Sequence, residues 1–183
     1  MPKQVLFVQG AGEGAHEADA KLAESLRREL GSAYEVIYPE MRGEASPQFS
    51  QWKLQLETEL AKSKEPIILV GHSAGASILM KCLNEINVER PVLGIFLLAA
   101  PFWGGEGWRY EGYEALELPK AGIAELSRII FLYHCRDDSS VPFEHQALYA
   151  ELMPHATKRE LDKGGHQFDD DLSLVAADIK KKF

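Results

Sequence analysis

A serine stands at the centre of one short motif, Gly71-His72-Ser73-Ala74-Gly75. The motif follows an apolar run at 66–70 that is typical of a buried strand, and it precedes a stretch at 74–86 that predicts a helix. A Gly-x-Ser-x-Gly motif at a strand-to-helix turn is a nucleophile elbow. Because glycine has no Cβ, the turn can be tight enough to strain the serine and raise its hydroxyl above the sheet edge. The motif therefore predicts a serine nucleophile, with a closely packed glycine turn without chemistry as the alternative.

A serine hydroxyl becomes an effective nucleophile only when a base takes its proton. In the elbow arrangement an acid and then a histidine follow the serine along the chain. His166 lies in a glycine-rich loop after the last predicted strand, from which an imidazole can reach over the sheet edge toward Ser73. We therefore expect His166 to be the base. We expect His134, at the end of a strand, to be structural, and solvent exposure to explain His145 and His155 on or beside a helix.

The acid should follow the strand predicted at 129–134, where two neighbouring aspartates, Asp137 and Asp138, stand. A carboxylate at this place can accept a hydrogen bond from the imidazole, hold its tautomer and stabilise the imidazolium. The residues alone leave both aspartates open, with Glu106 as a more remote alternative.

Short apolar runs alternate with longer amphipathic stretches along the chain. The apolar runs predict strands at 5–8, 34–38, 66–70, 92–98, 129–134 and 157–161. The amphipathic stretches predict helices at 16–30, 47–63, 74–86, 144–153 and 169–182. Because this alternation is typical of βαβ crossovers, we expect an α/β fold with a mostly parallel sheet of about six strands and helices on both faces. No linker or repeat divides the elements, which predicts a single domain over residues 1–183.

The composition restricts the partners and the compartment. The chain has 183 residues, a net charge of −8 and two cysteines, Cys82 and Cys135. The negative charge argues against nucleic acid and anionic membranes as partners. Two cysteines do not make a disulfide framework, and they suggest a reducing compartment. Because neither a leader nor an apolar run of membrane-spanning length is recognisable, we expect cytoplasmic residence.

The segment 101–122 interrupts the alternation and is rich in glycine and aromatic residues. It leaves the carboxyl end of a predicted strand, the edge at which open α/β sheets bind ligands. Long loops inside compact domains tend to be functional. We therefore expect Phe102, Trp103 and Trp108 to line a substrate site, with an aromatic cover over the core as the alternative.

Residues 135–143 resemble the Gly-x-x-Asp-x-x-Val-Pro element of many α/β-hydrolases. In that element the aspartate four residues before the proline orients the histidine, and this position is Asp138, with Cys135 in place of the glycine. The resemblance therefore implies that Asp138 is the acid. Asp137 would then cap the loop or pair with Arg136.

An oxyanion hole needs two backbone N–H groups aimed at the developing negative charge. One is expected from Ala74, directly after the nucleophile at the positive end of a helix. The other is expected from Ala11, in the loop after the first strand. Hydrolases of this fold commonly carry His-Gly at this point, whereas this chain has Gln9-Gly10.

Over nearly its full length the chain resembles the compact, lidless α/β-hydrolases of the retinoblastoma-binding-protein-nine type and related small bacterial esterase-like proteins. The resemblance rests on the elbow, the Asp138 segment, Gly165-His166 and the small size. It implies an α/β-hydrolase fold without a large lid domain, a triad of Ser73, Asp138 and His166, and no metal or organic cofactor.

We therefore expect a serine hydrolase that acts on small carboxylic esters or related acyl compounds through an acyl-enzyme. An interaction protein with the same fold and little activity is one alternative.

Nucleotide binding is another alternative function, because the glycine-rich residues 10–15 follow a strand and open a helix, and Glu40 could bind a ribose. A metal site is less favoured, because no ligand spacing such as His-Glu-x-x-His occurs. The sequence leaves the oligomeric state open.

Overall fold

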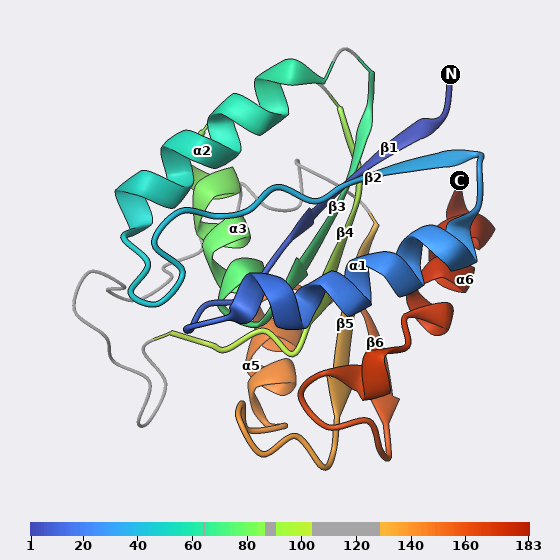
Figure 1. The fold of residues 1–183 in the computed structure, drawn as a ribbon. Coiled ribbons are helices and arrows are strands. Elements are labelled where there is room, and N and C mark those ends of the chain that lie inside the picture. Colours follow the sequence, from blue (N-terminus) through green and yellow to red (C-terminus); the bar gives the residue numbers. More distant parts are fainter. Residues whose placement is uncertain (64, 87–90, 104–128) are drawn as a thin grey trace.

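Six parallel strands form one sheet at the centre of the protein (Figure 1). The structure, a computed structural model, describes residues 1–63, 65–86, 91–103 and 129–183. All neighbouring strands are parallel and lie in the order β2-β1-β3-β4-β5-β6, which confirms the expected α/β fold. The strands are β1 (Lys3–Val8), β2 (Tyr34–Ile37), β3 (Ile67–His72), β4 (Val92–Leu98), β5 (Ile130–Cys135) and β6 (Thr157–Leu161).

Helices cover both faces of this sheet. Helices α1 (Ala15–Leu30) and α6 (Ser173–Lys182) pack against each other on one face. Helices α2 (Phe49–Lys62), α3 (Ser73–Glu85) and α5 (His145–Leu152) lie on the other. The helix expected at 169–182 begins later than predicted, because residues 168–170 have φ of 52°, 51° and 57°, which an α-helix excludes. These three residues form a separate short turn, η1 (Phe168–Asp170).

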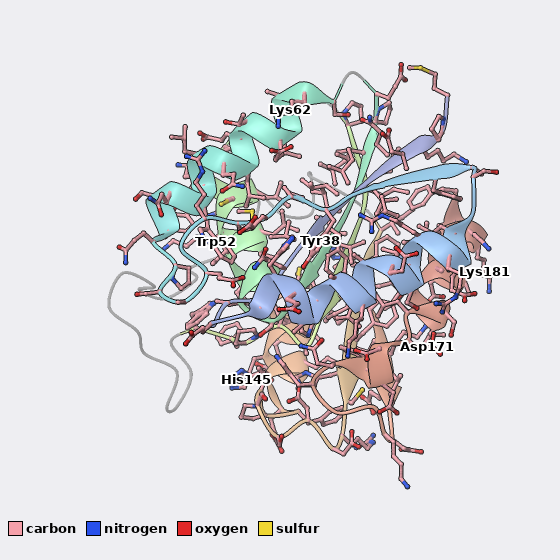
Figure 2. All side chains as sticks on the ribbon, viewed as in Figure 1. Tyr38, Trp52, Lys62, His145, Asp171 and Lys181 are labelled. Carbon is pink, nitrogen blue, oxygen red and sulfur yellow. The ribbon has the colours of Figure 1, made fainter. Side chains whose placement is uncertain are left out.

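Each face of the sheet buries its own apolar layer. Successive strand residues point to opposite faces, so Val5 and Phe7 of β1 join the layer under α1 and α6, while Leu6 and Val8 join the layer under α2 and α3. This two-sided burial explains why the four inner strands, β1, β3, β4 and β5, are largely apolar, whereas the edge strands β2 and β6 carry polar residues. Figure 2 shows the contrast on α2, whose Trp52 is fully buried against the sheet while Lys62 faces outward.

The strand order reverses direction between β1 and β3, because the chain moves from β1 outward to β2 and then returns to the other side of β1. In open parallel sheets, ligands bind at such a switch point, beyond the carboxyl ends of the strands. Ala11 lies in the loop that follows β1, and Ser73 follows β3 directly as the first residue of α3. The fold therefore brings these two segments to the edge where a site is expected.

The described part of the chain adds no lid domain over this edge. No helix within it is long and apolar enough to cross a membrane.

Candidate active site

Ser73 lies in a strained turn between β3 and α3. Its φ is 51°, a conformation that non-glycine residues rarely adopt, so the expected strain is confirmed. A Cβ on Gly75 would lie 1.9 Å from the carbonyl oxygen of Gln9, and one on Gly71 would lie 2.6 Å from the Cα of Ala76. Both glycines are therefore needed for the close approach of the turn to α3 and to the end of β1.

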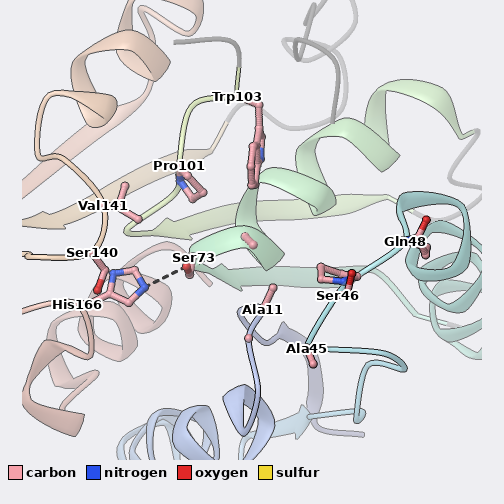
Figure 3. A pocket seen from close by; sticks show the side chains of 13 residues that line it. Ala11, Ala45, Ser46, Gln48, Ser73, Pro101, Trp103, Ser140, Val141 and His166 are labelled. Atoms are coloured by element: carbon pink, nitrogen blue, oxygen red, sulfur yellow. Dashed lines mark hydrogen bonds between the residues drawn. The ribbon is translucent and has the colours of Figure 1, made fainter. Parts of the chain in front are cut away.

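The structure brings Ser73, His166 and Asp138 together at the carboxyl edge of the sheet. His166 Nε2 lies 3.0 Å from Ser73 Oγ, the contact dashed in Figure 3. His166 Nδ1 lies 2.9 Å from Asp138 Oδ2. The three residues follow β3, β6 and β5, so parallel strands carry them to one edge. In this arrangement the imidazole can take the serine proton while the carboxylate holds the ring.

Asp138 is held as a carboxylate. Its side chain has no exposed surface, and its Oδ1 accepts the N–H groups of Ser140 at 2.8 Å and Val141 at 3.0 Å. His134 Nε2 lies 3.2 Å from Oδ2, which also contacts His166. Burial alone would raise the pKa of Asp138, but the hydrogen bonds from His134, His166 and Val141 outweigh burial and lower this pKa strongly. His134 therefore has a structural role, as expected: it contacts the carboxylate of Asp138 and helps to hold it.

Asp137 does not reach the imidazole and instead caps the loop that carries it. Its carboxylate accepts the N–H groups of Gly164 at 3.3 Å and Gly165 at 2.8 Å. This contact fixes the backbone directly before His166.

The two expected oxyanion donors border the cleft beside Ser73. Ala74 is the second residue of α3, and first-turn N–H groups have no partner within their own helix. On either side of Ala11, Gly10 N–H donates to Asp19 Oδ2 at 2.7 Å and Gly12 N–H donates to the carbonyl of Glu44 at 2.7 Å. These bonds anchor the loop around Ala11, whose side chain lies across the cleft from Trp103 in Figure 3.

Sequence reasoning missed a polar cluster that holds this loop. Gln9 is fully buried, and its Oε1 accepts hydrogen bonds from Met41 N–H at 3.0 Å and from His16 Nδ1 at 2.8 Å. Its Nε2 donates to Glu44 Oε2 at 2.6 Å. The Glu44 carboxylate also accepts the N–H groups of Gly14 and His16. The only sequence signal was Gln9 itself, a long amide where related hydrolases commonly have histidine.

The prediction of an exposed His145 is wrong. His145 is 5% exposed, and its Nδ1 accepts the N–H of Phe102 at 2.8 Å. Burial lowers the pKa of His145, and the nearby charge of His134 acts in the same direction. His155 is exposed, as expected.

A cleft of about 640 Å³ opens beside Ser73 and His166 (Figure 3). Trp103 lines it, as expected, but Phe102 is not among its described lining residues, because the Phe102 ring packs edge-to-face on Tyr149. Trp108 and Glu106 lie outside the described residues. The lining is small, apolar or uncharged polar apart from the imidazole of His166: Ala11, Gly12, Ala45, Ser46, Pro47, Gln48, Ser73, Ala74, Pro101, Trp103, Ser140, Val141 and His166.

The alternatives drawn from the glycine loop and from the histidines find little support. The N–H groups of Gly10, Gly12 and Gly14 all donate to acceptors within the chain, so they do not form a free cradle for phosphate. Among the described residues, no group of three or more histidine, cysteine, aspartate or glutamate side chains is placed to hold a metal ion.

A parallel sheet with a strained serine between its third strand and the following helix defines the α/β-hydrolase fold. The chain belongs to the serine hydrolase family, whose sequence pattern matches residues 16–171. A search of curated protein sequences finds no match.

Solved structures agree with this fold. The ydeN gene product from B. subtilis is similar with a TM-score of 0.82 and 21% identity, over 99% of this chain and 98% of that one. The esterase domain of a Rhodothermus marinus protein has a TM-score of 0.71 and 18% identity, over 99% and 86% of the two chains. The esterase EaEST from Exiguobacterium antarcticum has a TM-score of 0.67 and 14% identity, over 98% and 91%. At these identities the likeness concerns the fold.

Proposed function

We propose that this serine hydrolase cleaves small, uncharged carboxylic esters through an acyl-enzyme. The observation that carries the proposal is the pair of contacts of one imidazole, 3.0 Å to Ser73 Oγ and 2.9 Å to Asp138 Oδ2. The first contact is a hydrogen-bond distance across which the serine proton can pass to the imidazole, and the second lets the carboxylate hold the ring and stabilise the imidazolium. Two of the similar structures are esterases by name, which favours esters among acyl compounds.

In the proposed reaction, Ser73 Oγ attacks the ester carbonyl while His166 Nε2 takes the hydroxyl proton. The N–H groups of Ala74 and Ala11 stabilise the oxyanion of the tetrahedral intermediate. When the intermediate collapses, the C–O bond to the alcohol breaks and His166 returns its proton to the leaving oxygen. A water molecule, deprotonated by His166, then attacks the acyl-enzyme. The bond between Ser73 Oγ and the acyl carbon breaks, His166 returns the proton to Ser73 Oγ, and the carboxylic acid leaves.

The cleft supports an uncharged substrate of modest size. A charged substrate group would leave water without a compensating partner, because the described lining residues include no lysine, arginine, aspartate or glutamate. The volume of about 640 Å³ lies within the range of small-molecule sites. Trp103 supplies one wall for an apolar acyl or alcohol group.

Two finer assignments belong to this proposal. The compact fold and the Asp138 segment favour a relationship to the retinoblastoma-binding-protein-nine type within the hydrolases. Both cysteines are free and buried, which favours a reducing compartment such as the cytoplasm.

The test is a series of p-nitrophenyl esters from acetate to long-chain acyl groups, with wild type and Ser73→Ala. We expect turnover to be highest for short acyl chains and to fall to the uncatalysed level in Ser73→Ala. The matched control is Ser32→Ala, which removes an exposed serine hydroxyl far from the site. Turnover that survives in Ser73→Ala, or a maximum at long-chain lipids, would overturn the nucleophile or the substrate size, respectively.

A further inference from the structure

A second carboxylate–imidazole pair lies behind Ser73 and His166. Asp19 of α1 and His72 at the end of β3 are each 1% exposed, and Asp19 Oδ2 lies 2.8 Å from His72 Nδ1. The proposed reaction does not use either residue. A buried pair of ionisable groups is costly to desolvate, so its contacts need an explanation.

Both ring nitrogens of His72 face hydrogen-bond acceptors. Nε2 lies 2.9 Å from the backbone carbonyl oxygen of His166, which can only accept, so this nitrogen carries a proton. Nδ1 faces the carboxylate of Asp19, which also accepts Gly10 N–H at 2.7 Å and Gln167 Nε2 at 3.2 Å. An aspartate that receives these donors is ionised, so Nδ1 also carries a proton. The contacts therefore describe an imidazolium beside a carboxylate.

The surrounding charges favour the same state. Burial works against both charges, but the charge and hydrogen bond of His72 outweigh it and lower the pKa of Asp19. Burial likewise works against the His72 imidazolium, but Asp19, the carbonyl of His166 and the charge of Asp138 outweigh it and raise the pKa of His72. The groups around His72 thus come from α1 and from the loops after β5 and β6.

The pair joins the three segments that form the candidate site. Asp19 binds the loop after β1 through Gly10 and the loop after β6 through Gln167. His72 precedes the nucleophile and binds the carbonyl of His166. We propose that Asp19 and His72 form a pair that is charged at neutral pH and whose role is to position the loop of Ala11 and the loop of His166 on either side of Ser73. This inference rests on the proposed function for its kinetic consequence, although not for the charge state itself.

A neutral pair cannot make the same contacts. In Asp19→Asn, the amide has one acceptor oxygen and adds donors, while a neutral His72 has a single N–H. At least one of Gly10 N–H, the Gln167 amide and the His166 carbonyl then loses its partner. The substitution keeps the shape of the side chain, removes its charge and replaces one acceptor oxygen with a donor.

The charge state is tested by NMR of ¹⁵N-histidine in the whole chain, a measurement that needs no turnover. We expect one histidine, assigned to His72 by its loss in His72→Gln, to show both ring nitrogens protonated at about pH 7, where an ordinary imidazole is mostly neutral. In Asp19→Asn this imidazolium signal is expected to disappear. A neutral His72 in the wild type at about pH 7 would overturn the proposal, whatever the activity of the enzyme.

The positioning role is tested by the kinetics of Asp19→Asn against Asp178→Asn. Asp178 is an equally suitable buried control, because it accepts hydrogen bonds from Arg159 and Tyr133 and lies outside the site. We expect Asp19→Asn to lower kcat for p-nitrophenyl acetate, or the rate of fluorophosphonate labelling, by about 10- to 100-fold with little change in KM. Asp178→Asn is expected to leave kcat, the labelling rate and KM unchanged, although its Tm falls by a similar amount to that of Asp19→Asn. Equal kinetic losses in the two variants would overturn the positioning role and leave Asp19 with stability alone.

Discussion

At the scale of single residues, the two neighbouring aspartates after β5 have different roles, because their carboxylates accept hydrogen bonds from different donors. Asp138 turns inward and meets two histidine rings and two backbone N–H groups. Asp137 turns to the glycines before His166. Asp138 is thus the partner of the His166 imidazole, whereas Asp137, one residue earlier, caps the loop that carries His166.

Asp138→Asn is expected to lower kcat for p-nitrophenyl acetate by up to about 10⁴-fold, because an amide at this place favours the wrong imidazole tautomer. Asp137→Asn keeps an acceptor oxygen for Gly165 N–H and is expected to lower kcat far less. Steady-state kinetics of the two variants under the same conditions make the comparison. A larger loss in Asp137→Asn would assign the role of acid to Asp137.

At the scale of elements, the loop after β1 depends on a partner from a distant loop. Glu44 accepts hydrogen bonds from the Gln9 side chain and from Gly14 and His16 N–H groups. Burial would raise the pKa of Glu44, but these donors outweigh burial and lower it, so the side chain acts as a carboxylate clamp. The Glu44 carboxylate thus joins the two ends of the segment that contains Ala11, because Gln9 precedes Ala11 and Gly14 follows it.

Glu44→Ala is expected to lower kcat by about 10- to 100-fold, since a displaced oxyanion donor costs a large part of what a deleted donor costs. KM is expected to change less, because the cleft walls remain. The control is Glu40→Ala, which removes an exposed carboxylate from the same loop. Equal kinetics of Glu44→Ala and wild type would show that the Ala11 segment holds its position without the clamp.

The order and type of the main elements were predictable because they depend on local patterns. Short runs of mainly apolar residues predicted the strands. The two glycines around Ser73 predicted the tight turn, because a Cβ at either position would clash with neighbouring backbone. The left-handed turn at 168–170 was not predictable, because no glycine marks it. Phe168, the first residue of this turn, packs in the core, a contact that no local sequence pattern marks.

Contacts between distant segments account for most of what was missed at the site. Asp19 and His72 are 53 positions apart in the sequence, and Asp19 and Gln167 are 148 apart, so no local sequence pattern predicts these contacts. His145 looked exposed because its neighbours are polar, yet the chain after β4 folds over it. Ser73 and His166 were predictable because motif and chain order restrict both, whereas the choice of Asp138 depended on the family resemblance.

At the scale of the whole molecule, the buried carboxylates couple the stability of the fold to pH. Asp19, Asp138 and Asp178 each have a pKa lowered from the ordinary 3.8, so their contribution is present above that pH and is lost as the pH falls below it. His72 has a pKa raised from 6.5, so its contribution is complete below that pH and is lost as the pH rises through the raised value. The two limits enclose a range of maximal stability.

The free energy of unfolding is therefore expected to be highest between about pH 4 and 6.5 and to fall by a few kcal/mol on further acidification. Urea unfolding at a series of pH values, followed by circular dichroism, measures this curve. In Asp19→Asn the acid limb is expected to become shallower, because one lowered carboxylate is gone. A wild-type free energy that stays constant down to about pH 3 would contradict the assigned carboxylate contacts.

The proposed activity depends most on a serine hydroxyl activated by the imidazole beside it. Treatment with a fluorophosphonate near neutral pH, followed by intact and peptide mass spectrometry, tests this directly. We expect one covalent adduct on the peptide that contains Ser73, and none in Ser73→Ala or after acid unfolding. An unlabelled wild type, or an adduct that persists in Ser73→Ala, would contradict the central claim.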